Sequence, residues 1–374
     1  MLLPLYEKTE SVLLTILKKQ HKRANIKSIT MKTIKSLLLV FITIITISCD
    51  KELIIDSLPE EKGIPKGGEL PELPLSLTFT VQTEEDQMGE FAKNAMVEFN
   101  GKIWSIGGIN DYSSGNVSSD VWSSENGIHW VSVTHNQFSE REGHTLTVFD
   151  DKMWLIGGID NSGSHIGEIH YSTDGETWTL ATTLSSTLLA PAYHSTVVFN
   201  NKLYVIRDGF DNHTIVLSST DGVTWNLETD HAFSNRENFK AVVFENAIYA
   251  IGGTHLGTSF NEIWRSSDGI EWSLITPTGD IFSPRYAHTT TVHNGKVWVV
   301  GGITGSFSES HIDFWHTENM EDWTAYDGTL PTTEGLIHHA ALSYNDELWL
   351  FGGLQPNSAG LAPITGSIRS VRVD

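Results

Sequence analysis

The chain has 374 residues, 39% hydrophobic and 10% aromatic, which is enough to bury a large core. Its formal net charge is −22, and residues 1–48 hold 8 basic and 2 acidic side chains, which leaves a net −28 for the rest. A surface this acidic repels phosphate backbones, so we exclude nucleic acid as a partner. Cys49 is the only cysteine, which excludes a disulfide within a monomer and a cysteine-based zinc site.

The N-terminal part of the chain has the layout of a secretory signal. Met31 to Lys35 is a short basic stretch, Leu37 to Ile47 are eleven residues without a charge, and Ser48-Cys49 follow. Eleven apolar residues are too few to span a bilayer. Because residues 1–30 are polar and basic and precede a complete signal, we interpret them as an upstream extension and Met31 as the start.

A cysteine directly after a small residue at the end of the apolar run resembles the lipobox of bacterial lipoproteins. The sequence Thr46-Ile47 is similar to the relaxed form of Bacteroidetes-type lipoproteins. The resemblance implies a signal peptide at 31–48 and acyl chains on Cys49 as the mature N-terminus. It also implies a lipid anchor in the outer membrane or at the cell surface of a Gram-negative bacterium. The residues alone leave open an uncleaved anchor, or a soluble secreted protein with an incidental cysteine.

Residues 49–74 have the composition of a linker, with seven acidic residues, three glycines and four prolines, namely Pro59, Pro65, Pro71 and Pro74. Such a segment cannot bury enough apolar surface to fold alone, so we predict a disordered linker. As a flexible coil it would span about 30 Å.

From residue 75 onward one sequence motif recurs at a nearly fixed period. It is an apolar run with an aromatic residue three positions before a double glycine, as in Lys152-Met-Trp-Leu-Ile-Gly-Gly158. The first glycine stands at positions 107, 157, 252, 301 and 352, and Arg207-Asp208 replaces the pair in the third copy. The steps are 50, 50, 45, 49 and 51 residues. A period of this size indicates a series of repeated supersecondary units.

Each unit is predicted to be a four-stranded antiparallel sheet. In the second unit the strands are His144–Phe149, Lys152–Ile156, Gly167–Ser172 and Thr177–Ala181. The dipeptides Asp150-Asp151 and Asp174-Gly175 supply the positive φ that tight turns require. Because both faces of such a sheet are rich in apolar residues, the sheets must stack face to face, and a closed ring of sheets satisfies all of them.

The near-50 period, the double glycine and an aromatic residue in the fourth strand resemble kelch repeats over residues 75–374; the aromatic residues are Trp130, Trp178, Trp225, Trp272 and Trp323. The resemblance implies an all-β, six-bladed kelch-type β-propeller with four antiparallel strands per blade. The sixth unit lacks a fourth strand, and segment 75–81 alternates without a partner of its own. We therefore expect segment 75–81 to complete the last blade and close the ring of a monomer.

We predict a ligand site at the channel mouth on the face that carries the long loops, because such loops usually carry function. Thirteen positions before the first glycine, at the start of the innermost strand, four units have a histidine. Three positions earlier, three units have an arginine. The predicted site residues are Arg141, His144, His194, Arg236, Glu237, Arg285, His288 and His339.

Two roles are open for these side chains. Clustered arginines can hold a carboxylate or sulfate in bidentate fashion. They can equally pair blade to blade or bond loop carbonyls. Arg207 and Asp208 join the predicted site, because positions where a local rule fails are often functional. The alternative is that Arg207 and Asp208 pair with each other at the rim.

These features favour a lipid-anchored binding module that presents its loop face to a glycan or a protein. We expect no cofactor, and no metal, since the histidines lie on separate blades without accompanying carboxylates. The alternative is an enzyme similar to the six-bladed kelch sialate mutarotase (N-acetylneuraminate epimerase), with Glu237 as an acid/base residue for a carboxylated sugar. A galactose-oxidase-like copper site needs a cysteine within the propeller, and Cys49 lies outside it.

Overall fold

The computed structural model describes residues 76–83, 88–111, 116–184, 190–209, 211–328, 335–356, 365 and 367–373. The predicted segments 1–30, 31–48 and 49–74, with Cys49, lie outside the described residues. The described strands belong to one compact unit, Leu73–Asp374. Within the described ranges, no helix has the length and apolar character needed to cross a membrane.

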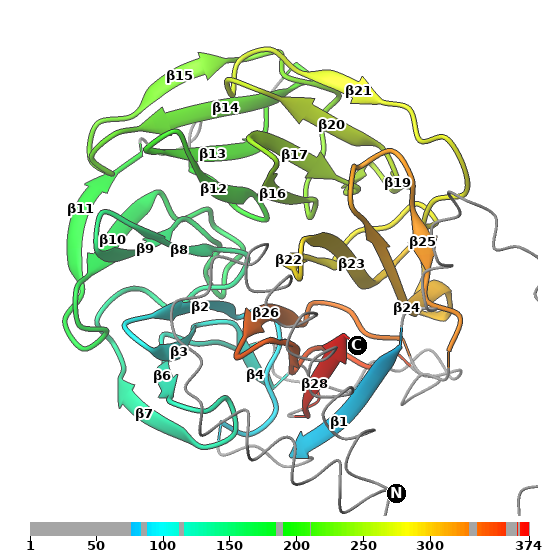
Figure 1. Cartoon of the computed structure of the whole chain (residues 1–374). Coiled ribbons are helices and arrows are strands. Elements are labelled where there is room, and N and C mark those ends of the chain that lie inside the picture. Colours follow the sequence, from blue (N-terminus) through cyan, green and yellow to red (C-terminus); the bar gives the residue numbers. More distant parts are fainter. Residues whose placement is uncertain are drawn as a thin grey trace, which may run out of the picture. The chain divides into compact units, whose positions relative to one another are not determined.

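Six four-stranded antiparallel sheets surround a central axis as the blades of a β-propeller, which confirms the predicted fold (Figure 1). The strands nearest the axis are β2 (Ala95–Phe99), β8 (Thr145–Phe149), β12 (Ser195–Phe199), β16 (Lys240–Phe244), β22 (Thr289–His293) and β26 (Ala340–Tyr344). The second strands are β3 (Lys102–Ile106), β9 (Lys152–Ile156), β13 (Lys202–Asp208), β17 (Ala247–Ile251), β23 (Lys296–Ile303) and β27 (Glu347–Phe351). 

The outer half of each blade consists of its third and fourth strands. The third strands are β6 (Val121–Ser124), β10 (Glu168–Ser172), β14 (Thr214–Ser219), β20 (Ile263–Ser266), β24 (Ser310–Thr317) and β28 (Ile368–Val373). The fourth strands are β7 (Trp130–Thr134), β11 (Thr179–Thr183), β15 (Asn226–Thr229), β21 (Ser273–Ile275), β25 (Thr324–Ala325) and β1 (Leu77–Thr83). Two small hairpins and one short 3₁₀ turn complete the described elements: β4 (Ile109–Asp111) with β5 (Asn116–Val117), β18 (Thr254–His255) with β19 (Thr258–Ser259), and η1 (Phe307–Glu309).

The ring is closed by the two ends of the propeller, as predicted. Strand β1 pairs antiparallel with β28, from Leu77 opposite Val373 to Thr83 opposite Ile368. Phe79 packs edge-on against Phe314 of blade five, with 5.3 Å between the ring centroids. The first and last strands therefore belong to one sheet, and this sheet also seals the junction with its neighbour.

The turns between first and second strands have the predicted backbone geometry. Both residues of each of the six turns have a positive φ, between 42° and 73°. In blade two the connection between the third and fourth strands is longer than predicted, since β10 ends at Ser172 and β11 begins at Thr179, whereas the fourth strand was expected from Thr177. Ser172 Oγ accepts the amide of Gly175, and Asp174 Oδ1 accepts the next two amides along the chain. These local hydrogen bonds hold a wider turn than the dipeptide alone predicts.

The repeated sequence motif of the second strand makes contacts between blades. Gly301 has a φ of +64°, and a Cβ there would lie 2.3 Å from the carbonyl oxygen of Leu336 in the next blade. Trp154, three positions before its own double glycine, packs on Gly222 in the turn of the following blade, where a Cβ would lie 2.1 Å from the indole. Both the glycine and the aromatic residue are therefore required by the close approach of neighbouring blades.

Candidate functional site

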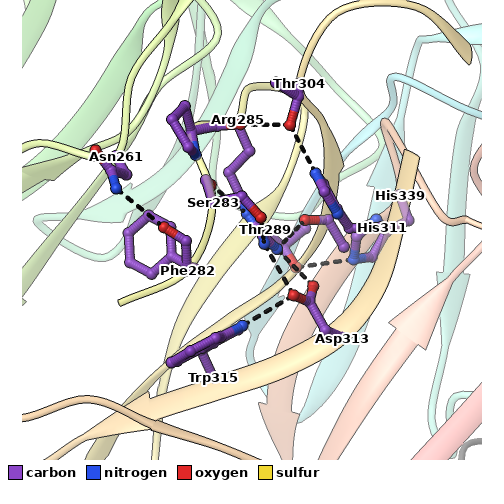
Figure 2. Close-up of polar contacts among 12 residues, drawn as sticks. Asn261, Phe282, Ser283, Arg285, Thr289, Thr304, His311, Asp313, Trp315 and His339 are labelled. Atoms are coloured by element: carbon purple, nitrogen blue, oxygen red, sulfur yellow. Dashed lines mark hydrogen bonds and ion pairs between the residues drawn. The ribbon is translucent and has the colours of Figure 1, made fainter. Parts of the chain in front are cut away.

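Arg285 is fully buried and holds the double-glycine turn of its own blade. Figure 2 shows its side chain paired with that of Asp313. Its Nη1 donates to the carbonyl oxygen of Gly301 (2.8 Å), and its Nε donates to that of Ser283 (3.0 Å). Its two Nη atoms meet the two carboxylate oxygens of Asp313 at 2.6 and 2.9 Å. Of the two roles that the sequence left open for Arg285, ligand binding and structural pairing, this bidentate ion pair is the structural one. It occupies both Nη atoms of the guanidinium group.

Arg141 and Arg236 have the same arrangement in blades two and four. Each donates Nη1 to the carbonyl of its own blade's first glycine, at 3.0 and 3.3 Å. Each pairs through Nη2 with a carboxylate on the third strand, Glu168 at 2.8 Å and Glu262 at 2.7 Å. Burial lowers the pKa of both guanidinium groups, and the facing carboxylates oppose that shift. Arg141, Arg236 and Arg285 thus lie inside their blades.

Blade three has a rearranged version of this pair. Pro191 stands sixteen positions before residue 207, where the arginine stands in blades two, four and five. Arg207 is buried, donates Nη1 to the carbonyl of Ala190 (3.2 Å) and pairs through Nη2 with Asp208 (3.2 Å). The second strand runs through both residues as regular β-structure. Arg207 and Asp208 are therefore paired as in the structural alternative.

The four predicted histidines are buried between blades. His144 Nε2 lies 3.0 Å from a backbone carbonyl of the preceding blade. His194 Nε2 lies 3.0 Å from Thr145 Oγ1, and His339 Nε2 lies 2.8 Å from Thr289 Oγ1. Burial lowers the pKa of His144 and His339 to about 3, so these imidazoles are neutral near pH 7. His144, His194 and His339 thus join the start of an innermost strand to the blade before it, whereas neither imidazole nitrogen of His288 has a hydrogen-bond partner.

One position closer to the loop face, six residues form a circle that we call the mouth ring. All six have a positive φ, between 50° and 64°. Five of their amides donate to the carbonyl of the equivalent residue in the preceding blade, at 2.7–3.3 Å. The mouth ring consists of Lys93, Gly143, Tyr193, Asn238, Ala287 and His338.

Blades one and two are joined at the mouth ring by side chains. Lys93 Nζ lies 2.9 Å from Glu142 Oε1, which also accepts a hydrogen bond from the hydroxyl of Tyr193 at 2.6 Å. The Lys93 ammonium is 5.8 Å from the centroid of the Tyr193 ring. Burial, followed by the bond to Glu142, raises the pKa of the Tyr193 hydroxyl. The network places the Tyr193 hydroxyl and the Lys93 ammonium on one carboxylate oxygen.

Glu237 is the one predicted site residue that is exposed on the loop face. Partial burial and then the charge of Asp208 raise the pKa of its carboxyl above the ordinary value. Burial, and then the charge of Glu237, raise the pKa of the half-buried Tyr286 hydroxyl. The predicted Asp208 and Glu237 are therefore brought into one electrostatic neighbourhood.

Lys240 is a further charged residue near the axis, at the start of β16. Its charge acts on His194, His288 and His338, which come from blades three, five and six. Only a side chain directed toward the axis lies near all three blades at once. Burial lowers the pKa of the Lys240 ammonium, and no carboxylate opposes the shift.

Sequence reasoning missed Lys240 and the polar members of the mouth ring, Lys93, Tyr193, Asn238 and His338. The repeat drew attention to positions with one recurring residue type, whereas the mouth-ring position changes type in every blade. Lys240 did carry a signal, because the other five units have alanine, serine or threonine there. Within the described ranges, no three His, Cys, Asp or Glu side chains are grouped so that they could hold a metal ion.

Comparison with known proteins agrees with this architecture. The profile of the DUF6242 beta propeller domain matches residues 161–364. Kelch domain-containing protein 3 of Bos taurus is 27% identical over 178 residues, which are 43% of this chain and 46% of that protein. The tRNA wybutosine-synthesizing protein 2/3/4 of Oryza sativa subsp. japonica is 32% identical over 98 residues, which are 25% of this chain and 9% of that protein. The chain thus spans less than half the length of these curated relatives.

Among solved structures, that of YjhT superposes with a TM-score of 0.61 at 15% identity. The superposition covers 78% of this chain and 99% of YjhT. At this identity the likeness shows the fold alone.

Proposed function

Because this chain belongs to the DUF6242 β-propeller family and is built of kelch-type blades, we propose that it is a binding module whose loop face recognises a glycan. Propellers of one fold serve many functions, so the proposal must rest on the site. It rests on the mouth ring. Five hydrogen bonds between blades fix the backbone of this circle, and its polar side chains are half-buried. A preorganised surface of this kind loses little entropy when a ligand binds.

The aromatic side chains at the loop face favour a glycan over a protein. Tyr193 belongs to the mouth ring and Tyr286 precedes its member Ala287, and both tyrosines are half-buried. A tyrosine offers an apolar face to the C–H side of a sugar and a hydroxyl to its polar groups. Lys93, Asn238 and Glu237 add donors and acceptors around them. A protein ligand remains the alternative partner for the same face.

We further propose that acyl chains on Cys49 hold the module at the outer membrane or cell surface of a Gram-negative bacterium. The support is the basic stretch, the apolar run and the Ser48-Cys49 junction. The acidic linker 49–74 would then separate the propeller from the lipid surface. Metabolic labelling with a fatty-acid analogue tests this: the full chain should be labelled and Cys49→Ala should not.

A glycan array probed with the full chain tests the binding proposal. Tyr286→Ala should weaken the signal by about tenfold or more, the loss of one aromatic anchor. Tyr171→Ala is the matched control, since Tyr171 is a half-buried tyrosine of the third strand in blade two. Equal loss in both variants, or retention in both, would place the ligand away from the loop face. If the full chain binds no glycan on the array, a protein ligand becomes the proposal for this face.

A second candidate, a sialate mutarotase-like enzyme, is favoured by one observation. Glu237 has a raised pKa, and the Tyr193–Glu142 pair lies on the same face, so two acid/base groups are present there. Ring opening of a carboxylated sugar needs such groups. NMR of freshly dissolved sialic acid should then show faster anomer equilibration with the protein than with Glu237→Gln. Rates equal to those in buffer would eliminate this candidate.

A further inference from the structure

The start of β16 departs from the pattern that joins neighbouring blades near the axis. In blades two and five the first residue of the innermost strand is a threonine, and its hydroxyl bonds the histidine of the following blade. Thr145 Oγ1 lies 3.0 Å from His194 Nε2, and Thr289 Oγ1 lies 2.8 Å from His339 Nε2. Blade four has Lys240 at this place. An ammonium cannot accept a hydrogen bond, so it cannot replace the threonine in full.

The histidine that follows Lys240 around the ring is left without a side-chain partner. His288 is 1% exposed, and neither of its imidazole nitrogens has a hydrogen-bond partner within bonding geometry. The carbonyl of Ile251 is near enough only to favour the charged form slightly. Buried polar atoms without partners are rare in native proteins, and each calls for a water, an ion or a ligand group.

Lys240 itself also lacks a partner. Its ammonium makes no hydrogen bond or ion pair with any described residue, and burial is the sole cause that acts on its titration. Glu142, which precedes Gly143 of the mouth ring, is already paired with Lys93. A desolvated charge without a counter-charge is costly, so the site is incomplete as it stands.

We propose that Lys240 anchors an oxyanion group of the ligand on the axis, with the imidazoles of His288 and His338 as neighbouring hydrogen-bond donors. The inference rests on the proposed binding function, and it names the class of ligand as an acidic glycan. A carboxylate, a sulfate ester and a phosphate ester share this chemistry. An ammonium offers three donors and a point charge, and a neutral imidazole offers one N–H.

The charge of the rest of the molecule gives this site its selectivity. Residues 49–374 carry a net −28, so anions are repelled from most of the surface. An anionic ligand must therefore be received by a local cation without a partner. Arg141, Arg236 and Arg285 are occupied by Glu168, Glu262 and Asp313, and Arg207 pairs with Asp208. Among the described residues near the axis, Lys240 keeps donors that no carboxylate occupies.

Calorimetric titration of the full chain with four matched sugars tests the inference. The ligands are glucuronate, glucose 6-sulfate, glucose 6-phosphate and uncharged glucose. At least one charged sugar should bind about tenfold or more tighter than glucose, a difference of about 1.4 kcal/mol. The charged sugar with the highest affinity identifies the oxyanion. Equal affinities for all four would overturn the inference.

The decisive variant is Lys240→Thr, which restores the residue found in blades two and five. It should fold with a thermal midpoint no lower than that of the parent chain, because a hydroxyl can bond His288. Its preference for the charged sugar should fall to about that of glucose. Lys240→Met, which keeps the length but not the charge, should lose the preference for the charged sugar in the same way. Lys102→Thr, on the opposite face, is the control and should keep the preference.

The result also separates this inference from the binding proposal. A glycan-array signal that Lys240→Thr retains in full would overturn the oxyanion anchor and leave the binding module standing. Selective binding of charged sugars that depends on Lys240, with no glycan recognised on the array, would support the anchor and contradict the glycan proposal.

Discussion

Single buried charges decide how the double-glycine turns are held. Arg285 satisfies two backbone carbonyls and one carboxylate from a position without solvent exposure. Its contacts show why an arginine is required: a lysine would have the charge but not the planar fork. The same logic explains blade three, where Arg207 and Asp208 provide the pair from the second strand.

Replacing Arg285 by methionine should destabilise the protein by about 1–3 kcal/mol, because the carbonyls of Ser283 and Gly301 would lose their buried donor and half-buried Asp313 its counter-charge. Urea unfolding followed by tryptophan fluorescence measures this. Arg285→Met/Asp313→Leu should recover part of the loss, since the unpaired carboxylate is gone. Arg265→Met, at a half-buried position of β20, should change stability by about 0.5 kcal/mol or less. An Arg285→Met effect as small as that of Arg265→Met would contradict the structural role.

The interblade histidines predict a stability that falls in acid. Their folded pKa lies below the unfolded value of 6.5, at about 3 for His144 and His339. The unfolded chain therefore binds protons that the folded chain does not, and the stabilisation present above pH 6.5 is lost as the pH falls toward 3. Blade four has Phe239 at this position, so phenylalanine is compatible with the fold.

His144→Phe should be less sensitive to acid than the parent chain. Removing one such histidine should reduce the slope of unfolding free energy against pH by about 1.4 kcal/mol per pH unit between pH 5.5 and 4. Urea titrations at pH 7, 5.5, 4.8 and 4 measure the slope. His129→Phe, at an exposed position, is the control and should leave the slope unchanged. Parallel slopes for His144→Phe and the parent would show that His144 is protonated in the folded state.

At the scale of strands and turns, the repeat was a reliable guide where backbone geometry depends on one or two residues. The first turns, with both residues at positive φ, follow from their Asn, Asp and Gly content. The second turn of blade two extends to residue 178 and not to 176 as predicted, because the side chains of Ser172 and Asp174 bond amides further along and widen the loop. Hydrogen bonds of this kind depend on side-chain direction, which a dipeptide pattern does not contain.

The contact between a first glycine and the next blade can be tested with a matched pair. Gly301 and Gly295 have nearly equal φ, +64° and +71°, but a Cβ at Gly301 meets the Leu336 carbonyl at 2.3 Å and a Cβ at Gly295 meets nothing within 4 Å. Gly295→Ala should cost about 1–2 kcal/mol for the left-handed conformation. Gly301→Ala should cost about 1–3 kcal/mol more, for the overlap. Equal effects in urea unfolding would show that φ alone requires the glycine.

The candidate site was harder to predict than the blades. Equivalent positions could be read from the period, so Arg141 and His144 were placed correctly in the repeat, but their burial depends on how neighbouring blades meet. The mouth ring shares a backbone conformation and not a residue type, so no pattern of letters marks it. Lys240 stands out only once the bonds from Thr145 and Thr289 to the following blades are known.

At the scale of the whole molecule, closure depends on β1, the only strand of blade six that precedes blade one in the chain. Without β1 the strand β28 becomes an unpaired edge, and Phe314 loses its contact with Phe79. A chain of residues 84–374 should therefore unfold at a lower temperature than one of residues 73–374, and should elute earlier in size exclusion because edges associate. Identical behaviour of the two chains would show that closure contributes little.

The mouth ring separates what holds the propeller together from what faces the solvent. Its circle is joined through main-chain amides and carbonyls, so a mutation at Lys93, Tyr193, Asn238 or His338 leaves those bonds in place. The residue types at these six positions can consequently change in evolution, or be randomised in the laboratory, while the scaffold stays constant. Related chains with the same blades are expected to differ most at these six positions, and the module can acquire a new ligand without having to refold.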